Sequence, residues 1–114
     1  MSIEFEDISP NFRRITIAGR LDIAGTEAIA VKFTNLAASA ARRVVLDLTA
    51  VSFLASIGIR ELITCAKALE QRDGRMVLYV GDNAAVAKTL EVTGIDSLIP
   101  VFSAQAEADQ AALA

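Results

Sequence analysis

Ser56 is the residue whose type and position suggest switchable chemistry. It follows the apolar stretch Val44 to Leu48 after a short loop and opens a segment with helical spacing. At the first turn of a helix the backbone N–H groups point outward and the helix dipole is positive, so an anion is well tolerated there. A phosphate on the Ser56 oxygen would add charge without disturbing the core. Ser56 is also the only capping side chain directly at this start, so we expect it to cap the helix.

Two neighbours of Ser56 indicate a contact surface. At about 100° per residue, Ile57 falls about 160° from the buried Ile59 of the same helix, so it points outward. An apolar side chain there suggests contact with a partner, although lone surface isoleucines are common and the helix could begin one residue later. Arg60 lies one turn after Ser56, where it could pair with a phosphate or an acidic partner. The alternative for Arg60 is a solvated charge or a pair with a neighbouring carboxylate.

The chain lacks the residues of most catalytic and metal sites. It has no histidine, which removes the commonest general base near neutral pH, the usual zinc ligands and every Ser-His or Cys-His pair. Its single cysteine, Cys65, is expected to be packing in the core. No glycine-rich phosphate-binding motif occurs. We therefore expect a protein that is not an enzyme and holds no metal or cofactor.

Composition predicts one soluble domain over residues 1–114. The length of 114 residues leaves no room for a second core, and a hydrophobic content of 54% is ample for burial. A net charge of −3 and a pI of about 4.8 argue against nucleic acid and anionic lipid as partners. The longest apolar run is far below the roughly 20 residues of a membrane span, and the acidic N-terminus is unlike a signal peptide. The single cysteine fits a reducing, cytoplasmic location.

The first part of the chain predicts a hairpin followed by a helix. Residues 3–7 and 12–18 have the pattern of strands, and the turn residues at 9–11 favour antiparallel pairing. Asp22 follows the end of the second strand and is predicted to cap the next helix. This helix is expected to cover residue 24 to about residue 40. It is predicted to bury Ile29, Phe33, Leu36 and Ala40.

The remainder alternates strands and helices. Val44 to Leu48 is typical of a strand buried on both faces, so Asp47 within it needs a hydrogen-bond partner. In the helix predicted over 56–72, Gly58 could allow close approach to the sheet, and Gly74 is expected to form a left-handed C-cap. This helix is predicted to bury Ile59, Leu62, Ile63, Ala66 and Leu69.

Further along, the pattern predicts a strand over 76–80, a turn at 81–83 and a helix over 84–93 that Gly94 ends. An edge strand around Pro100 and a fraying helix from Ser103 follow. This order predicts an α/β fold with a mixed sheet of four to five strands, an N-terminal antiparallel hairpin and about four helices packed on it.

Several segments together resemble the STAS domain (sulfate transporter and anti-sigma factor antagonist), in its stand-alone bacterial anti-sigma factor antagonist form. The most specific is Val-Leu-Asp-Leu-Thr-Ala-Val-Ser-Phe-Leu at 45–54, followed by Ala-Ser-Ile-Gly-Ile-Arg-Glu-Leu at 55–62. Weaker matches are Gly-Arg-Leu-Asp at 19–22, Thr-Gly-Ile-Asp at 93–96 and Ile-Pro-Val-Phe at 99–102. They cover nearly the whole chain in the family's order, so the resemblance implies the STAS fold.

The resemblance also implies a function. Family members bind an anti-sigma factor that is a serine kinase, and phosphorylation of a serine corresponding to Ser56 ends the binding until a phosphatase restores it. Asp22 corresponds to the aspartate that lies beside this serine. The chain departs from the family pattern in three places: Ala55 stands where aspartate is usual, Ile57 replaces a second serine, and Arg60 replaces a small residue.

We therefore expect a single docking surface formed by the turn at 19–22, the helix start at Ser56 and the outer side of that second helix. Two other functions stay open: a constitutive STAS scaffold or transport-associated subunit that is never phosphorylated, and a module that senses a small ligand or nucleotide. The expected partners are the anti-sigma factor kinase and a phosphatase, and a weak homodimer is left open. The residues expected to contact the partner are Asp22, Leu54, Ala55, Ser56, Ile57 and Arg60.

Overall fold

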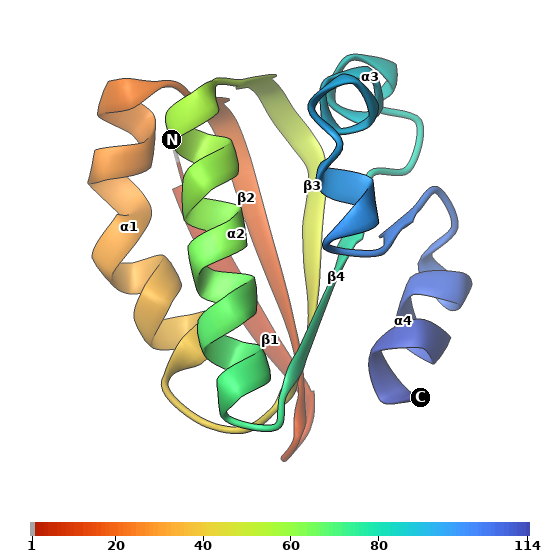
Figure 1. Ribbon diagram of the computed structural model, residues 1–114. Coiled ribbons are helices and arrows are strands. Elements are labelled where there is room, and N and C mark those ends of the chain that lie inside the picture. Colours follow the sequence, from red (N-terminus) through yellow and green to blue (C-terminus); the bar gives the residue numbers. More distant parts are fainter. Residues whose placement is uncertain (1) are drawn as a thin grey trace.

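The structure is a computed structural model that describes residues 2–114. It contains one five-stranded sheet with the strand order β1-β2-β3-β4-β5 (Figure 1). β1 and β2 are antiparallel, and every other neighbouring pair is parallel. The elements are β1 (Ser2–Ser9), β2 (Phe12–Leu21), α1 (Ile23–Ala38), β3 (Arg43–Leu54), α2 (Ser56–Gln71), β4 (Arg75–Tyr79), α3 (Ala84–Thr93), the 3-10 helix η1 (Ile95–Ser97), β5 (Val101–Phe102) and α4 (Gln105–Leu113).

This architecture confirms the predicted α/β class, the element order and the N-terminal hairpin. β5 is a two-residue strand at the sheet edge, as the proline before it led us to expect. Over residues 2–114 the structure contains no helix with the length and apolar character needed to cross a membrane.

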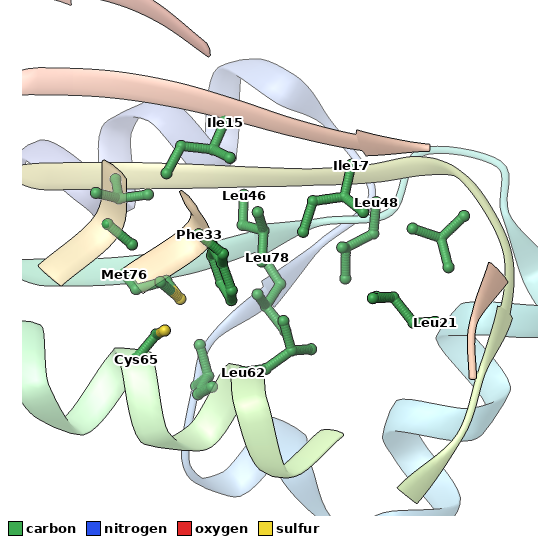
Figure 2. Packing of buried hydrophobic residues seen from close by; sticks show 14 of the residues in the cluster. Ile15, Ile17, Leu21, Phe33, Leu46, Leu48, Leu62, Cys65, Met76 and Leu78 are labelled. Carbon is green, nitrogen blue, oxygen red and sulfur yellow. The ribbon is translucent and has the colours of Figure 1, made fainter. Parts of the chain in front are cut away.

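The first part of the central strand β3, from Val44 to Leu48, is buried on both faces, as its sequence predicts. Val44, Leu46 and Leu48 pack into the main core with side chains of α1 and α2, whereas Val45 packs on the opposite face. In Figure 2, side chains of β2, β3 and β4 point toward Leu62 and Cys65 of α2. The smaller core on the opposite face consists of buried Phe12, Val45, Val77, Ala108 and Ala112.

Helix α1 begins as predicted and ends earlier. The Asp22 carboxylate caps it by accepting a hydrogen bond of 2.8 Å from the Gly25 N–H. The helix stops at Ala38, with Ser39 as its C-cap, so Ala40 lies outside it and is only half-buried. The prediction that Ala40 belongs to the buried stripe is wrong, because the chain turns toward β3 before reaching it. Ala37 and Ala38 are buried instead.

Strand β3 is much longer than the predicted segment Val44 to Leu48, and no loop precedes α2. It continues to Leu54 because β2 extends beside it to Leu21. The register between the two strands shifts twice. Thr16 and Ala18, two positions apart on β2, pair with Asp47 and Ala50, which are three positions apart on β3. Further along, β3 again has one residue more than the β2 segment with which it pairs. Each shift is a β-bulge, which bends a strand and increases its twist. Asp47 accepts hydrogen bonds from the Thr49 N–H and hydroxyl at 2.9 and 2.7 Å, which provides its expected partner.

The bulged part of β3 is held by one side chain from the next turn of the chain. The Asn83 amide nitrogen donates to the carbonyl oxygens of Val51, Leu48 and Thr49, at 2.7, 3.1 and 3.4 Å. Its amide oxygen accepts from the Val86 N–H at 3.3 Å and so caps α3. Asn83 therefore joins the start of α3 to the segment of β3 that leads to α2.

Two predictions for α2 are wrong. The left-handed residue after the helix is Asp73, with φ of 63°, and not Gly74. Gly74 serves close packing instead, since a Cβ there would lie 2.6 Å from the Arg42 carbonyl oxygen. The buried face is also rotated relative to the prediction, because α2 packs against α1 as well as the sheet, and Ile59, Ile63 and Ala66 are only partly buried. The buried residues are Gly58, Leu62, Cys65 and Leu69.

Helix α4 is docked on the sheet, contrary to the fraying that was predicted. Ala108 and Ala112 are fully buried against the smaller core. The Asp109 carboxylate also accepts hydrogen bonds of 3.1 Å from the Arg14 guanidinium of β2. Alanines allow this close approach, because their short side chains let the helix lie directly on Val45 and Val77.

Candidate functional site

Ser56 is the first residue of α2 and is exposed. The N-cap is Ala55, whose backbone is extended, with φ of −87° and ψ of 169°. The prediction that the Ser56 side chain caps the helix is wrong, because Ser56 already has helical geometry and lies one position too late. Among residues 2–114, no hydrogen-bond partner of the Ser56 hydroxyl is found. The oxygen is therefore free to be modified without loss of a helix cap.

The start of α2 is fixed to the end of β2. The Ala55 N–H donates to the Leu21 carbonyl oxygen at 3.0 Å, and Leu21 pairs with Leu54 in the parallel ladder. A Cβ on Gly58 would lie 3.0 Å from Leu21 Cβ and equally close to its carbonyl oxygen. As expected from the sequence, glycine at this position lets the first turn of α2 rest directly on the sheet. Ser56 is thus held by rigid elements on both sides.

The start of α1 is equally constrained. A Cβ on Gly25 would overlap the Arg20 carbonyl oxygen, so only glycine fits there. The hydrogen bond from the Gly25 N–H lowers the pKa of Asp22 below its usual value of 3.8, and the interaction with Arg20 contributes a smaller lowering. Asp22 is therefore a negatively charged helix cap at neutral pH. Its other carboxylate oxygen lies 3.4 Å from Nε of Arg20.

Ile23 and Phe53, which the sequence interpretation did not single out, complete this end of the molecule together with Arg20 of the 19–22 turn. The Arg20 guanidinium lies over the Phe53 ring, 4.5 Å from its centroid, because the two residues pair across β2 and β3. Phe53 is 43% exposed and Ile23, the first residue of α1, is 65% exposed. Phe53 could have been identified from its place next to the buried Leu54, since successive strand residues face opposite sides. We call Arg20, Asp22, Ile23, Phe53 and Ser56 the Ser56 surface.

The other predicted contact residues differ in accessibility. Arg60 is exposed, and among residues 2–114 no carboxylate lies within ion-pair distance of its guanidinium. Ala55 and Ile57 are half-buried, so Ile57 offers less apolar surface than its helical position indicated. Leu54 is only 6% exposed and packs in the main core beneath the Ser56 surface. Contact of these residues with a partner stays a prediction.

The single cysteine of the chain lies in the core. Cys65 is buried beside Thr34 and Glu61, and this burial raises the pKa of its thiol to about 11. It is therefore a protonated core residue, in agreement with the packing role expected for it. Among residues 2–114 no group of three or more His, Cys, Asp and Glu side chains could hold a metal ion.

Comparison with known proteins identifies the fold. The STAS domain family model matches residues 6–108. An anti-sigma factor antagonist from Mycobacterium paratuberculosis has a TM-score of 0.84 at 21% identity, covering 99% of this chain and 96% of that one. An anti-sigma-factor antagonist (STAS) domain protein from Planctomyces limnophilus has a TM-score of 0.80 at 26% identity, covering 96% of each chain.

The cell fate determinant SpoIIAA of Bacillus, in its phosphorylated form, has a TM-score of 0.67 at 20% identity, covering 94% of this chain and 96% of that one. A comparison with curated protein sequences gave no match. These three structures share the fold with this chain over almost their whole length.

Proposed function

The chain belongs to the STAS domain family, and we propose that it is an anti-sigma factor antagonist. In this proposal it binds an anti-sigma factor that is also a serine kinase, and phosphorylation of Ser56 ends the binding. A phosphatase would restore the unmodified form. The protein would act by binding alone, in the cytoplasm where sigma factors work.

The free hydroxyl of Ser56 at the start of α2 is the observation that carries this proposal. An exposed oxygen without a structural hydrogen bond can enter the active site of a kinase without local unfolding. The added phosphate would lie at a helix N-terminus, where negative charge is favourable. The modification is therefore expected to leave the fold intact.

The Ser56 surface offers a partner both apolar contact and a charge that can be reversed. Phe53 and Ile23 supply exposed apolar area, and aromatic residues are common anchors of interfaces. Arg20 and Asp22 largely balance each other, while Arg60 adds a positive charge. Phosphate contributes about −1.5 to −2 charges at neutral pH, so the surface would become negative on modification. A partner that binds the unmodified surface would then be repelled by the negative charge or would lose its contacts with that surface.

Phosphorylation can be tested with the anti-sigma factor kinases of the host. Each kinase is incubated with ATP and the wild-type, Ser56→Ala or Ser52→Ala protein, and the modified residue is located by mass spectrometry. Ser52 is a suitable control because it is exposed on β3 only four residues away. We expect labelling of wild type and Ser52→Ala and none of Ser56→Ala. Labelling that persists in Ser56→Ala would contradict the assignment.

Binding is tested separately, by calorimetry with the kinase that labels Ser56. We expect Ser56→Asp to bind at least tenfold more weakly than wild type, with a melting temperature that barely moves, because an acidic residue in the first turn of a helix is tolerated. Equal affinity of the two proteins would contradict the switch. That result would instead favour a STAS subunit that binds its partner constitutively.

A further inference from the structure

The free edge of β5 borders a groove that the proposed switch does not use. β5 is the last strand in the sheet order, so β4 is its one neighbour among the strands of residues 2–114. Figure 1 shows α3 on the β4 side of the molecule, away from α1. A groove of about 520 Å³ is lined by residues of α3, η1 and β5. Its lining includes apolar Ala87, Leu90 and Val101 and acidic Glu91 and Asp96.

The backbone of Val101 is directed toward the open edge of the sheet. The Pro100 carbonyl oxygen accepts a hydrogen bond from the Leu78 N–H of β4 at 2.8 Å. The Phe102 carbonyl oxygen accepts one from the Val80 N–H at 2.9 Å. Since the backbone groups of successive strand residues point to opposite sides within the sheet, Val101 turns its N–H and C=O away from β4. Unpaired groups at a sheet edge form a template for another strand.

The side chains of the groove are apolar at its base and acidic at its rim. Leu90 is buried, and Ala87 and Val101 are half-buried against the main core. Glu91 and Asp96 are exposed, and among residues 2–114 no Lys or Arg nitrogen lies within 4.0 Å of either carboxylate. No basic residue is present in the described lining, so the groove carries two negative charges and attracts a cationic partner.

These features specify the segment that would fit the groove. In an antiparallel strand pair, a residue opposite Val101 can exchange both backbone hydrogen bonds with it. The side chain of that residue would lie on the same face as Val101, toward Ala87 and Leu90, where there is room for a small apolar group. Residues two positions to either side share this face, because strand side chains alternate. They are the positions from which basic side chains would reach the acidic rim.

We propose that the edge of β5 binds an extended segment of a partner protein by strand addition. The segment would carry a small apolar residue opposite Val101 and basic residues two positions to either side of it, paired with Glu91 and Asp96. Main-chain bonds would supply affinity and the alternate side chains specificity. The occupant would not be β1 of a second copy, because that edge strand, Ser-Ile-Glu-Phe-Glu-Asp-Ile-Ser, is itself acidic. None of these residues belongs to the Ser56 surface, so the proposal is independent of the switch.

The probe for the test is the peptide acetyl-Lys-Thr-Val-Thr-Lys-amide, added to the ¹⁵N-labelled full chain at constant ionic strength. We expect saturable shifts of the Ala87, Glu91 and Val101 amide signals, and slower hydrogen exchange of the Val101 N–H. The same peptide N-methylated at its valine lacks the central backbone donor and should bind about fivefold more weakly. The peptide acetyl-Glu-Thr-Val-Thr-Glu-amide has the opposite charge and should also bind at least about fivefold more weakly.

Variants of the protein test the acidic rim. Glu91→Gln should weaken binding of the lysine peptide about two- to fivefold. Glu27→Gln, the same change at an exposed glutamate of α1, should leave the affinity unchanged. Melting temperatures equal to that of wild type would show that both variants are folded. Asp96→Asn provides the same comparison if Glu91→Gln does not fold.

Four results would overturn the proposal. They are the absence of any saturable shift, shifts confined to the Ser56 surface, equal affinity for the N-methylated peptide, and undiminished affinity in the rim variant. Equal affinity for the N-methylated peptide would show that side chains alone make the contact, without an added strand.

Discussion

The contact of Asn83 with the bulged part of β3 leads to a quantitative prediction. The variant Asn83→Ser retains a side-chain oxygen able to cap α3 and removes the amide nitrogen that donates to Val51, Leu48 and Thr49. Asn83→Ala removes both functions. The pair of variants therefore separates the bond to β3 from the helix cap.

The expected loss follows from the three hydrogen bonds. Leu48 and Val51 are buried, with exposed fractions of 0% and 2%, whereas Thr49 is exposed and its carbonyl can bond to water. At about 1 kcal/mol for each of the two buried bonds, Asn83→Ser should lower the free energy of unfolding by about 2 kcal/mol. Loss of the cap adds about 1 kcal/mol, which gives about 3 kcal/mol for Asn83→Ala. For a domain of this size, 2 kcal/mol corresponds to a fall in melting temperature of about 8–10 °C.

Urea unfolding followed by far-ultraviolet circular dichroism measures both values. Amide hydrogen exchange adds a local measure, and we expect Phe53 and Leu54 to exchange faster in Asn83→Ser than in wild type. A change below about 0.5 kcal/mol for Asn83→Ser would refute the reasoning, because the two carbonyls would then be satisfied equally well by water. Equal losses in Asn83→Ser and Asn83→Ala would show that the serine does not cap α3.

Three further predictions concern the elements around Ser56 and the core. Gly58→Ala should destabilise the protein by about 1–3 kcal/mol in urea unfolding, because its Cβ would press on Leu21, and an unchanged stability would show that α2 can shift freely. The pKa of Asp22 is lowered in the folded protein, so the stabilisation of the fold by this carboxylate is complete above pH 3.8 and is lost as pH falls through the folded-state pKa. The free energy of unfolding should therefore depend less steeply on pH in this acid range in Asp22→Asn than in wild type. Cys65, with its pKa raised to about 11, should react with iodoacetamide only at the rate of global unfolding, and rapid labelling of native protein would contradict its burial.

Local patterns in the sequence were sufficient to predict the structural features that depend only on neighbouring residues. Asp22 precedes a helix and caps it, and Gly94 ends α3 with a left-handed φ of 76°. The almost wholly apolar run Val44 to Leu48 correctly indicated a strand buried on both faces. In each case the physical cause lies within a few residues, so it is visible in the sequence.

Features set by distant contacts could not be predicted in the same way. The length of β3 depends on β2 and on the Asn83 amide, which follows the bulged segment by more than thirty residues. The rotated face of α2 results from its contact with α1. At Ser56 the difference is one position: the sequence indicated serine as the cap of α2, but Ala55, whose N–H bonds to Leu21, occupies the N-cap position and Ser56 is the first helical residue. The outward direction of the Val101 backbone likewise requires the pairing of β4 with β5 to be known.

The docking of α4 also has a consequence for synthesis of the protein. Its ion pair joins Asp109 to Arg14, so nearly the whole chain must be translated before this contact can form. Until the last turn leaves the ribosome, Phe12, Val45 and Val77 on that face of the sheet stay open to water or to other chains. A nascent chain stalled before α4 should therefore be the species that chaperones bind and proteases cleave. The most C-terminal helix, far from Ser56, thereby determines when the protein becomes a finished domain.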